Sequence, residues 1–367
     1  MKTYKLKIAI IGTVGIPAKY GGFETLAEYL VKELNENHDF TVYCSASQYA
    51  NEKKNTYLGA KLKYLPLSAN GSSSILYDVW SIIHSFFYAD ILLILGVSGA
   101  FMIPFVRFFS KKKIITNIDG LEWKRDKWNG FAKKYLKYQE KIAVRSSHFT
   151  VVDNQGIADH VKNAYGKDSV LIAYGADHVF HEQVNEASRE ALKIPRKYAF
   201  KVCRIEPENN IHIILEAFSK SDVNIVIVGN WGNSDYGKKL KNEYKSFQNI
   251  FLLDPIYDQQ KLNELRSNCH LYIHGHSAGG TNPSLVEAMF LGLPIIAFDV
   301  NYNRFTTDNR ALYFKDVEEM IVMLRNVEKN ETQLLEIAKE MKSVASERYT
   351  WKIISQKYSA LFSAKPV

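Results

Sequence analysis

Short apolar runs alternate with amphipathic stretches along most of this chain, and that alternation limits the possible folds more than any other feature. In segment 23–35, for example, Leu26, Leu30 and Leu34 fall on one helical face. Strands separated by helices pair in parallel, through right-handed crossovers. The first half therefore predicts an α/β domain with strands at residues 7–11, 40–44, 61–66, 91–95, 113–117, 149–152 and 169–172.

The second half repeats this alternation, with strands expected at 198–202, 224–228, 250–252, 270–274 and 294–298 and two helices finishing the chain. A length of 367 residues also suits two domains. We predict two doubly wound, Rossmann-like parallel-sheet domains, 1–175 and 176–349, with a C-terminal helix at about 350–367 packing back on the first. Ligands of such sheets lie beyond the carboxyl ends of the strands, so we expect a cleft between facing domains.

Composition narrows the class of protein. Hydrophobic residues make up 46% and charged residues 23%, which indicates a globular chain with real cores. The net charge of +8 suits an anionic partner such as a nucleotide, a lipid diphosphate or an acidic membrane, although a Lys-rich soluble surface would also explain it. No zinc spacing or dense basic run indicates nucleic-acid binding. Three widely spaced cysteines predict neither a disulfide framework nor a metal cluster and favour the reducing cytoplasm.

The longest uncharged stretch, 91–106, is too short for a spanning helix, which needs about 20 residues. It also contains Gly96, Gly99 and Pro104. We therefore predict a buried strand followed by a loop and a helix. A peripheral position on the cytoplasmic face of a membrane stays open.

A glycine-rich loop, 12–22, follows the first predicted strand and precedes a helix. Glycine lets backbone N–H groups approach a ligand, and a helix N-terminus favours anions. The dinucleotide fingerprint is absent because Gly12 and Gly15 are three residues apart. Gly15, Gly21 and Gly22 are nevertheless predicted to contact a sugar or phosphate. A tight turn without a ligand is the alternative.

A second cluster, 274–289, follows a predicted strand and enters a helix. Pro283 suits a first helical turn, whose N–H groups can hold a phosphate, and Glu287 could accept two hydroxyl donors from a ribose. A helix cap with a surface acid is the alternative. The candidate donor-binding residues of this segment are Gly279, Gly280, Thr281, Asn282, Ser284 and Glu287.

Four stretches, 12–25, 119–125, 204–210 and 279–289, together resemble retaining GT-B-fold glycosyltransferases of family 4. More narrowly, they are similar to bacterial polysaccharide rhamnosyltransferases. The resemblance implies that the second domain binds a nucleotide sugar and the first binds the acceptor, a lipid-diphosphate-linked glycan of surface polysaccharide (O-antigen or capsule) synthesis. It implies no cofactor and no metal. Arg204 would neutralise the donor diphosphate, Glu287 would hold the ribose, and Ile256 and Tyr257 would flank the base.

Three positions depart from the family pattern. Gly279 stands where relatives often carry an acid, and Asn209 stands where many carry a lysine, for which Lys201, Lys238 or Lys239 is a candidate replacement. Asp119 stands where many have a histidine that contacts the 6-hydroxyl of the sugar. A 6-deoxy sugar lacks that hydroxyl, so we predict a dTDP-L-rhamnose donor.

The candidate catalytic residues are Arg204, Asp119 and Glu122, and no nucleophile or general base is assigned. Asp119 is equally well explained as a turn residue before Gly120.

On the acceptor side, the lysines of 111–113 and the basic run 124–145 are interleaved with aromatic residues, a combination that suits a membrane interface. An amphipathic helix that packs its rings inward is the alternative. The aromatic residues are Trp123, Trp128, Phe131, Tyr135 and Tyr138.

Other functions remain as rivals at this stage. A glycosyltransferase using a UDP- or GDP-hexose would differ only in its donor. A non-hydrolysing epimerase would convert the donor without an acceptor. A non-catalytic nucleotide-sugar-binding protein would do neither.

Overall fold

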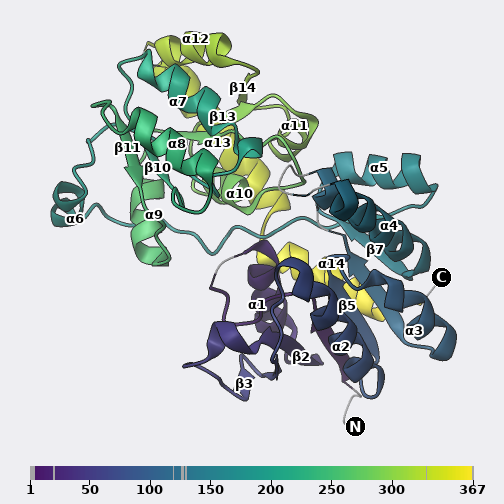
Figure 1. The fold of residues 1–367 in the computed structure, drawn as a ribbon. Helices are drawn as coiled ribbons and strands as arrows, with labels where there is room; N and C mark the ends of the chain where they lie inside the picture. Colours follow the sequence, from purple (N-terminus) through teal and green to yellow (C-terminus); the bar gives the residue numbers. More distant parts are fainter. Residues whose placement is uncertain are drawn as a thin grey trace. The chain divides into compact units, whose positions relative to one another are not determined.

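The computed structural model describes residues 5–19, 21–118, 120–124, 128, 130–327 and 329–365. The chain forms two compact units, one made of residues 1–175 and 351–367 and the other of residues 176–350 (Figure 1). Each unit is a parallel-sheet α/β domain, which confirms the predicted fold class.

An eight-stranded sheet with the order β3-β4-β2-β1-β5-β6-β7-β8 forms the centre of the first unit. All its described pairings are parallel except that of β3 with β4. The strands are β1 (Leu6–Ile11), β2 (His38–Ser45), β3 (Thr56–Tyr57), β4 (Ala60–Leu65), β5 (Ile91–Leu95), β6 (Lys113–Asn117), β7 (Phe149–Val152) and β8 (Val170–Leu171).

Helices connect these strands in the manner of a doubly wound domain. They are α1 (Gly22–Leu34), α2 (Ser74–Phe86), α3 (Ile103–Phe109), α4 (Gly130–Ser146), α5 (Gln155–Tyr165) and α14 (Trp351–Ser363). The short 3-10 turns are η1 (Ala46–Tyr49), η2 (Gly71–Ser73), η3 (Ala100–Met102) and η4 (Glu122–Lys124).

The second unit has a six-stranded parallel sheet with the order β11-β10-β9-β12-β13-β14. Its strands are β9 (Ala199–Val202), β10 (Ile225–Val228), β11 (Ile250–Leu253), β12 (Leu271–His274), β13 (Ile295–Phe298) and β14 (Leu312–Phe314). Its helices are α6 (Glu186–Ala191), η5 (Pro207–Asn209), α7 (Ile211–Ser219), α8 (Asp235–Tyr244), α9 (Gln259–Ser267), α10 (Pro283–Phe290), α11 (Asn301–Thr306), α12 (Val317–Val327) and α13 (Glu331–Arg348).

The prediction of two final helices is wrong, because three helices, α12, α13 and α14, follow β14. No glycine or proline stands at the break between α13 and α14. The break at Tyr349 and Thr350 instead coincides with the point where the chain leaves the second unit and returns to the first. Tertiary packing therefore sets this boundary, and local sequence does not mark it.

In each sheet the strand order reverses at one place. The reversal lies between β1 and β5 in the first unit and between β9 and β12 in the second. At such a switch point the loops that follow the two strands diverge, leaving a crevice at the carboxyl edge of the sheet where ligands bind. In the second unit, these loops are 203–210 and 275–282.

Helix α14 packs against α1 and completes the core of the first unit (Figure 1). The ring of Trp351 is buried and stacks on Tyr29, with centroids 4.4 Å apart and planes 6° apart. Gly175 must lack a side chain, because a Cβ there would lie 2.4 Å from the Trp351 ring. The inward residues Ile354, Tyr358 and Phe362 continue the same contact along the helix.

Trp351→Ala should destabilise the first unit by about 3–5 kcal/mol, because truncating a buried tryptophan removes apolar burial and leaves a cavity. Amide exchange in β1 should then accelerate by more than a hundredfold, since each 1.4 kcal/mol corresponds to a factor of ten. Leu335→Ala, at a side chain that is 67% exposed, is the control and should change stability by less than about 0.5 kcal/mol. Unchanged exchange in β1 of the Trp351 variant would refute this role of α14.

Candidate functional site

The switch point of the second unit joins two loops that are about 70 residues apart in the sequence. The backbone N–H of Ser277 donates to the Glu208 carbonyl at 2.8 Å, and the Asn210 side-chain amide donates to the Gly275 carbonyl at 2.8 Å. Gly275 permits this approach, because a Cβ there would lie 2.2 Å from the Asn209 carbonyl oxygen. The structure therefore brings the loop of Arg204 and the 279–289 segment to one edge of the sheet.

Arg204 is half exposed at this edge, with its Nε 3.7 Å from Glu206 Oε2. The Asn209 side-chain amide nitrogen donates to the Arg204 carbonyl at 2.9 Å, and the Asn209 side-chain oxygen, Oδ1, lies 3.2 Å from His276 Nδ1. Asn209 therefore braces the loop. Asn209 is the neutral residue that stands where we expected, from the family resemblance, that many relatives carry a lysine.

The N-terminus of α10 is closed by its own cap. Asn282 Oδ1 accepts hydrogen bonds from the backbone N–H and the hydroxyl of Ser284, at 3.0 and 2.8 Å. Pro283 has no N–H, and the N–H of Leu285 donates to the Asn282 carbonyl. The N–H groups expected to hold a phosphate thus already have partners within the helix start. Backbone contacts to a ligand are better sought in residues 279–281, where Gly279 has φ 105°.

Glu287 is held by two basic side chains from outside its helix. Its Oε1 lies 3.1 Å from His178 Nε2, and its Oε2 accepts a hydrogen bond from Arg266. Burial by itself would raise the pKa of Glu287, but Arg266 and His178 outweigh that effect and lower the pKa to about 2. Sequence reasoning missed both partners, because no local spacing links Arg266 in α9 or His178 to this acid.

Lys201 is a buried cation in β9, three residues before Arg204, and is only 1% exposed. The backbone of Lys201 pairs with β10, whereas its side-chain ammonium group has no hydrogen bond or ion pair among the residues that the structure describes. Burial lowers the pKa of Lys201, against an opposing effect of Cys203. Burial also lowers the pKa of His274 in β12, and the charge of Lys201 lowers it further, so the ammonium group lies within electrostatic reach of the switch point.

The other two replacement candidates named from the sequence lie elsewhere. Lys238 and Lys239 are exposed on α8, and Lys238 lies 3.6 Å from Asp235. Only Lys201 of these three candidates is buried, and only Lys201 belongs to a strand of the switch point.

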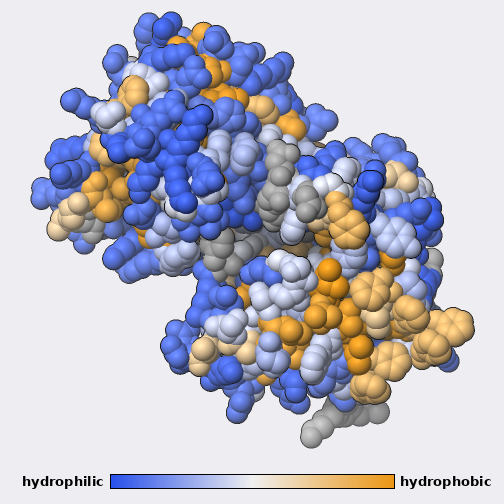
Figure 2. All heavy atoms as spheres, in the orientation of Figure 1, coloured by the Kyte–Doolittle hydropathy of each residue, from blue (hydrophilic) through white to orange (hydrophobic). Residues whose placement is uncertain are grey.

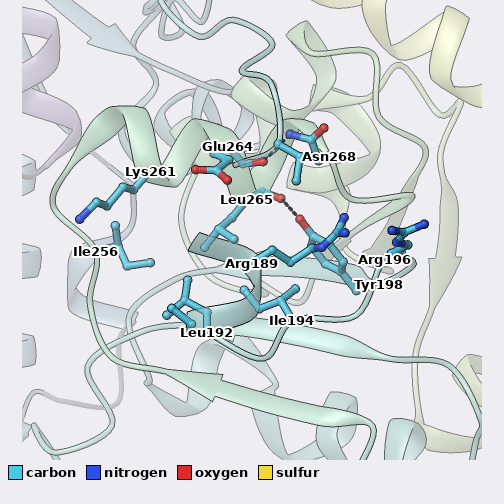
Figure 3. Close-up of a pocket in the computed structure, with 12 residues that line it drawn as sticks. Arg189, Leu192, Ile194, Arg196, Tyr198, Ile256, Lys261, Glu264, Leu265 and Asn268 are labelled. Carbon is cyan, nitrogen blue, oxygen red and sulfur yellow. Dashed lines mark hydrogen bonds between the residues drawn. The ribbon is translucent and has the colours of Figure 1, made fainter. Parts of the chain in front are cut away.

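A cavity of about 510 Å³ runs beside α9, and Ile256 lines it (Figure 3). Its wall is largely apolar, including Leu192, Ile194 and Leu265, and Figure 3 shows Lys261 and Arg196 at its edges. The described lining residues include neither Arg204 nor any residue of 275–287. The structure thus groups Ile256 with this cavity. Tyr257 is 63% exposed.

The glycine-rich loop of the first unit is tied to carboxylates of the helix that follows it. The N–H of Val14 donates to Glu24 Oε1 at 2.7 Å, and the N–H of Ala18 donates to Glu28 Oε2 at 2.5 Å. A Cβ at Gly21 would lie 2.0 Å from Glu24 Oε2. Two N–H groups of the loop thus bond to side chains of α1. Contacts of Gly15, Gly21 and Gly22 with the nucleotide sugar stay predictions.

Of the two acids predicted for catalysis in the first unit, Asp119 lies outside the described residues. Glu122 begins η4 and accepts a hydrogen bond from Trp128 Nε1 at 3.1 Å. A third acid, Asp78 of α2, was missed because it sits in an otherwise apolar helix pattern. Burial raises its pKa to about 7, and the Gly99 backbone partly offsets this.

Metal-binding clusters and membrane-spanning helices are both absent from the residues that the structure describes. No group of three or more His, Cys, Asp or Glu side chains suited to a metal ion occurs among the described residues. Within the same residues, no helix has the length and apolar character needed to cross a bilayer.

The chain matches two protein families. Residues 5–177 match a family described as a domain of unknown function (DUF1972). Residues 184–344 match the family of glycosyl transferases group 1, a stretch that holds Arg204 and the whole 279–289 segment. The chain is a glycosyltransferase. A search of the curated proteins finds no match.

Solved structures resemble this glycosyltransferase over nearly its whole length. Sucrose-phosphate synthase from Thermosynechococcus elongatus has a TM-score of 0.80 at 13% identity, covering 98% of both chains. Anabaena HepE in complex with UDP-glucose has a TM-score of 0.75 at 15% identity, covering 98% of this chain and 100% of the other.

A putative UDP-N-acetylglucosamine 2-epimerase from Listeria monocytogenes is also similar, with a TM-score of 0.65 at 14% identity over 99% of both chains. Identities this low show a common, GT-B-like fold, which glycosyltransferases and an epimerase share. The family match in the second unit therefore carries the assignment as a glycosyltransferase.

Glu287→Gln should lower the free energy of unfolding of the second unit by about 3–5 kcal/mol, because it leaves Arg266 buried without a charge partner. The double variant Arg266→Met, Glu287→Leu should recover much of that loss, since replacing both buried charges by apolar groups is often neutral. Urea denaturation of both variants checks this. Equal destabilisation by the single and double variants would contradict it.

The contribution of Glu287 to the stability of the second unit depends on pH, and the direction follows from its pKa. The pKa of Glu287 falls from 4.5 to about 2 on folding, so its ionised form stabilises the native state at neutral pH. The free energy of unfolding of the wild type should therefore lose this contribution as the pH falls from about 4.5 to about 2. The double variant lacks Glu287, so its urea denaturation should not show this loss.

Proposed function

We propose that this glycosyltransferase moves L-rhamnose from dTDP-L-rhamnose onto a lipid-diphosphate-linked glycan in bacterial surface polysaccharide synthesis. The observation that carries the proposal is the pair of loops joined at the β9/β12 switch point, where Arg204 and the 279–289 segment meet. The donor is narrowed by two departures from the family pattern, Gly279 and Asp119. We further propose that the protein works at the cytoplasmic face of the inner membrane.

In the proposed reaction, negative charge grows on the departing diphosphate, and positive groups aimed at it lower the barrier. Arg204 is half exposed at the switch point and would contact the diphosphate directly. Lys201 would supply the second positive charge that Asn209 lacks. A positive charge on a side chain that is 1% exposed and has no described anionic partner is unfavourable, and a bound diphosphate would compensate it. With these two cations, transfer is proposed to need no metal ion.

Glu287 is proposed to hold the donor ribose. Each of its carboxylate oxygens has one protein partner, and such an oxygen can accept a further hydrogen bond. Its lowered pKa keeps it an acceptor at neutral pH. Ile256 and Tyr257 are proposed to flank the base, and residues 279–282 and 284 to contact the sugar and phosphates.

The first unit is proposed to bind the acceptor. Its own switch point carries the loop 12–21, and Asp119 and Glu122 follow β6, two strands from β1. Either acid would serve as a general base or a sugar contact. Gly15, Gly21 and Gly22 are proposed to contact the donor sugar from this side.

A UDP-hexose donor is the second candidate, because HepE, of the same fold, binds UDP-glucose. A panel of nucleotide sugars with a synthetic lipid-diphosphate monosaccharide separates the candidates. We expect acceptor-dependent release of dTDP from dTDP-L-rhamnose, in the presence of EDTA, and at most weak turnover of UDP-glucose. Strong turnover of UDP-glucose with none of dTDP-L-rhamnose would overturn the rhamnose assignment. Donor conversion without acceptor would instead indicate an epimerase.

Lys201→Met should reduce transfer by about a hundredfold, the lower end of the loss typical of removing one charge-stabilising contact. It should leave the melting temperature unchanged or raise it, because the variant removes a buried charge without a described partner. A residue with a merely structural role would lose stability and activity together. The matched control is Lys238→Met at an exposed lysine, expected to keep full activity.

Arg204→Ala gives the reference for a direct diphosphate contact. We expect about a hundredfold loss of transfer with the fold intact, since the side chain is half exposed. If Lys201→Met keeps wild-type turnover while Arg204→Ala loses it, Lys201 has no role in the site. The proposed reaction would not be affected by that result.

A further inference from the structure

Helices α2 and α3 of the first unit expose an unusual number of large apolar side chains. The members, which we call the α2–α3 face, are Leu76, Trp80, Ile83, Phe87, Phe105, Phe108 and Phe109, and their exposed fractions range from 46% to 82%. Figure 2 shows apolar side chains gathered over the region that Figure 1 labels α2 and α3. Contiguous exposed apolar surface of this kind marks an interaction site in soluble proteins.

This face is additional to the core that the same helices build. On α2, Tyr77 and Ile82 are fully buried, and on α3, Ile103 and Val106 are buried. The two helices meet through the turn before α3, where a Cβ at Gly99 would lie 2.6 Å from the Cβ of Asp78. The outward apolar residues thus stand on a packed base, and the ring contacts described for them join chain neighbours, Phe86 with Phe87 and Phe108 with Phe109.

The exposed charged residues of α2, α3 and α4 are all basic, whereas Asp168, beside Lys167, is an exposed acid next to them. The acidic residues of α2, α3 and α4 are Asp78 and Glu140, and both are buried, at 3% and 2% exposure. The exposed basic residues of α3, of α4 and of the loop between α3 and β6 include Arg107, Lys111, Lys134, Lys141 and Arg145. An anionic surface would therefore meet attraction here and no exposed acid from these helices.

A hollow of about 430 Å³ lies beside the aromatic residues of α3. It is lined by Pro104, Arg107, Phe108, Arg145, Ser146 and Lys167, so three cations share it with an aromatic ring. Arg107 is positioned there by hydrogen bonds to the carbonyls of Ser146 and Ser147, at 3.1 and 3.4 Å. Cations beside an exposed Phe suit a lipid phosphate above an acyl chain.

These charges favour one occupant over the alternatives. A second copy of the chain placed with its own α2–α3 face against this one would bring cations against cations, which is unfavourable. A bilayer with anionic lipids supplies both an apolar phase and negative charge. The contact would be interfacial, because among the described residues no helix is fit to span a bilayer.

We infer that the α2–α3 face inserts into the interface of an anionic membrane and that the hollow at Arg107, Arg145 and Lys167 takes a lipid phosphate. The inference rests on the proposed function, because the α2–α3 face would be the surface that brings the enzyme to a lipid-linked acceptor. Membrane binding itself needs no donor and no transfer.

The surface differs from the basic and aromatic run expected from the sequence. In that run, Trp123 Nε1 donates to Glu140 at 2.9 Å and the Tyr135 hydroxyl donates to the Ser98 carbonyl at 2.8 Å, so both are used within the unit. Phe131 and Tyr138 are exposed, at 82% and 61%, and α4 packs on α3. The apolar part of the surface therefore comes mainly from α2 and α3.

Co-sedimentation of the full chain with vesicles tests the inference. We expect binding to phosphatidylethanolamine vesicles containing phosphatidylglycerol and little binding to pure phosphatidylcholine. Phe108→Ser with Phe109→Ser should weaken binding at least tenfold, and Arg107→Ala with Arg145→Ala should weaken it and reduce its salt dependence. Phe180→Ser, at a 55% exposed side chain of the second unit, is the matched control and should bind as wild type.

Wild-type vesicle binding by both double variants would overturn the inference, as would a wild-type chain that fails to bind the anionic vesicles. Sedimentation without lipid tests whether a second copy of the chain occupies the face instead. A dimer that is lost in the Phe108→Ser, Phe109→Ser variant would assign the face to a second copy. Transfer to a soluble short-chain acceptor should be unchanged in that variant. A different result would separate the two proposals: the double variants lose vesicle binding, but the wild type transfers sugar to no acceptor. That result would contradict the proposed function and support the membrane-binding role of the α2–α3 face.

Discussion

The contact between the loops after β9 and β12 is the interaction on which the site of this glycosyltransferase depends. A parallel sheet that reverses its strand order leaves these loops without neighbouring strands to hold them. The hydrogen bonds from Ser277 to Glu208 and from Asn210 to Gly275 fasten them to each other. Because Gly275 has no side chain, the two backbones come close enough for Arg204 and the 279–289 segment to share one edge.

Periodicity predicted the fold well because it reports burial. Strand β5 is an apolar run that is buried throughout, and β6 is buried at all but its first residue, so the predicted limits 91–95 and 113–117 match the observed ones. Two elements were missed, the short strand β14 and the helix α5, although Asn154 caps the start of α5 and Gly166 ends it in the left-handed conformation. The break between α13 and α14 was missed for a different reason, since it reflects passage between units and has no local chemical marker.

The local geometry of the candidate site was predictable where neighbouring residues in the sequence determine it, while the roles of these residues stay predictions. Glycines, a helix-starting proline and a cap residue stand next to one another, and the loops they form adjoin as the topology requires. Partners distant in sequence could not be predicted, because Arg266, His178 and Glu287 meet only in the folded unit. The burial of Lys201 was equally hidden, since a lysine within a strand is usually expected to face water.

Helix α14 has a consequence for the order in which the protein is made. Residues 176–350 form the second unit in one continuous segment, whereas the core of the first unit includes Trp351, Ile354, Tyr358 and Phe362. On the ribosome, the unit whose synthesis begins first can complete its core only after the other unit has been translated in full. The usual N-terminal-first sequence of domain folding is thereby inverted, and the nascent first unit waits with an open groove until its last helix emerges.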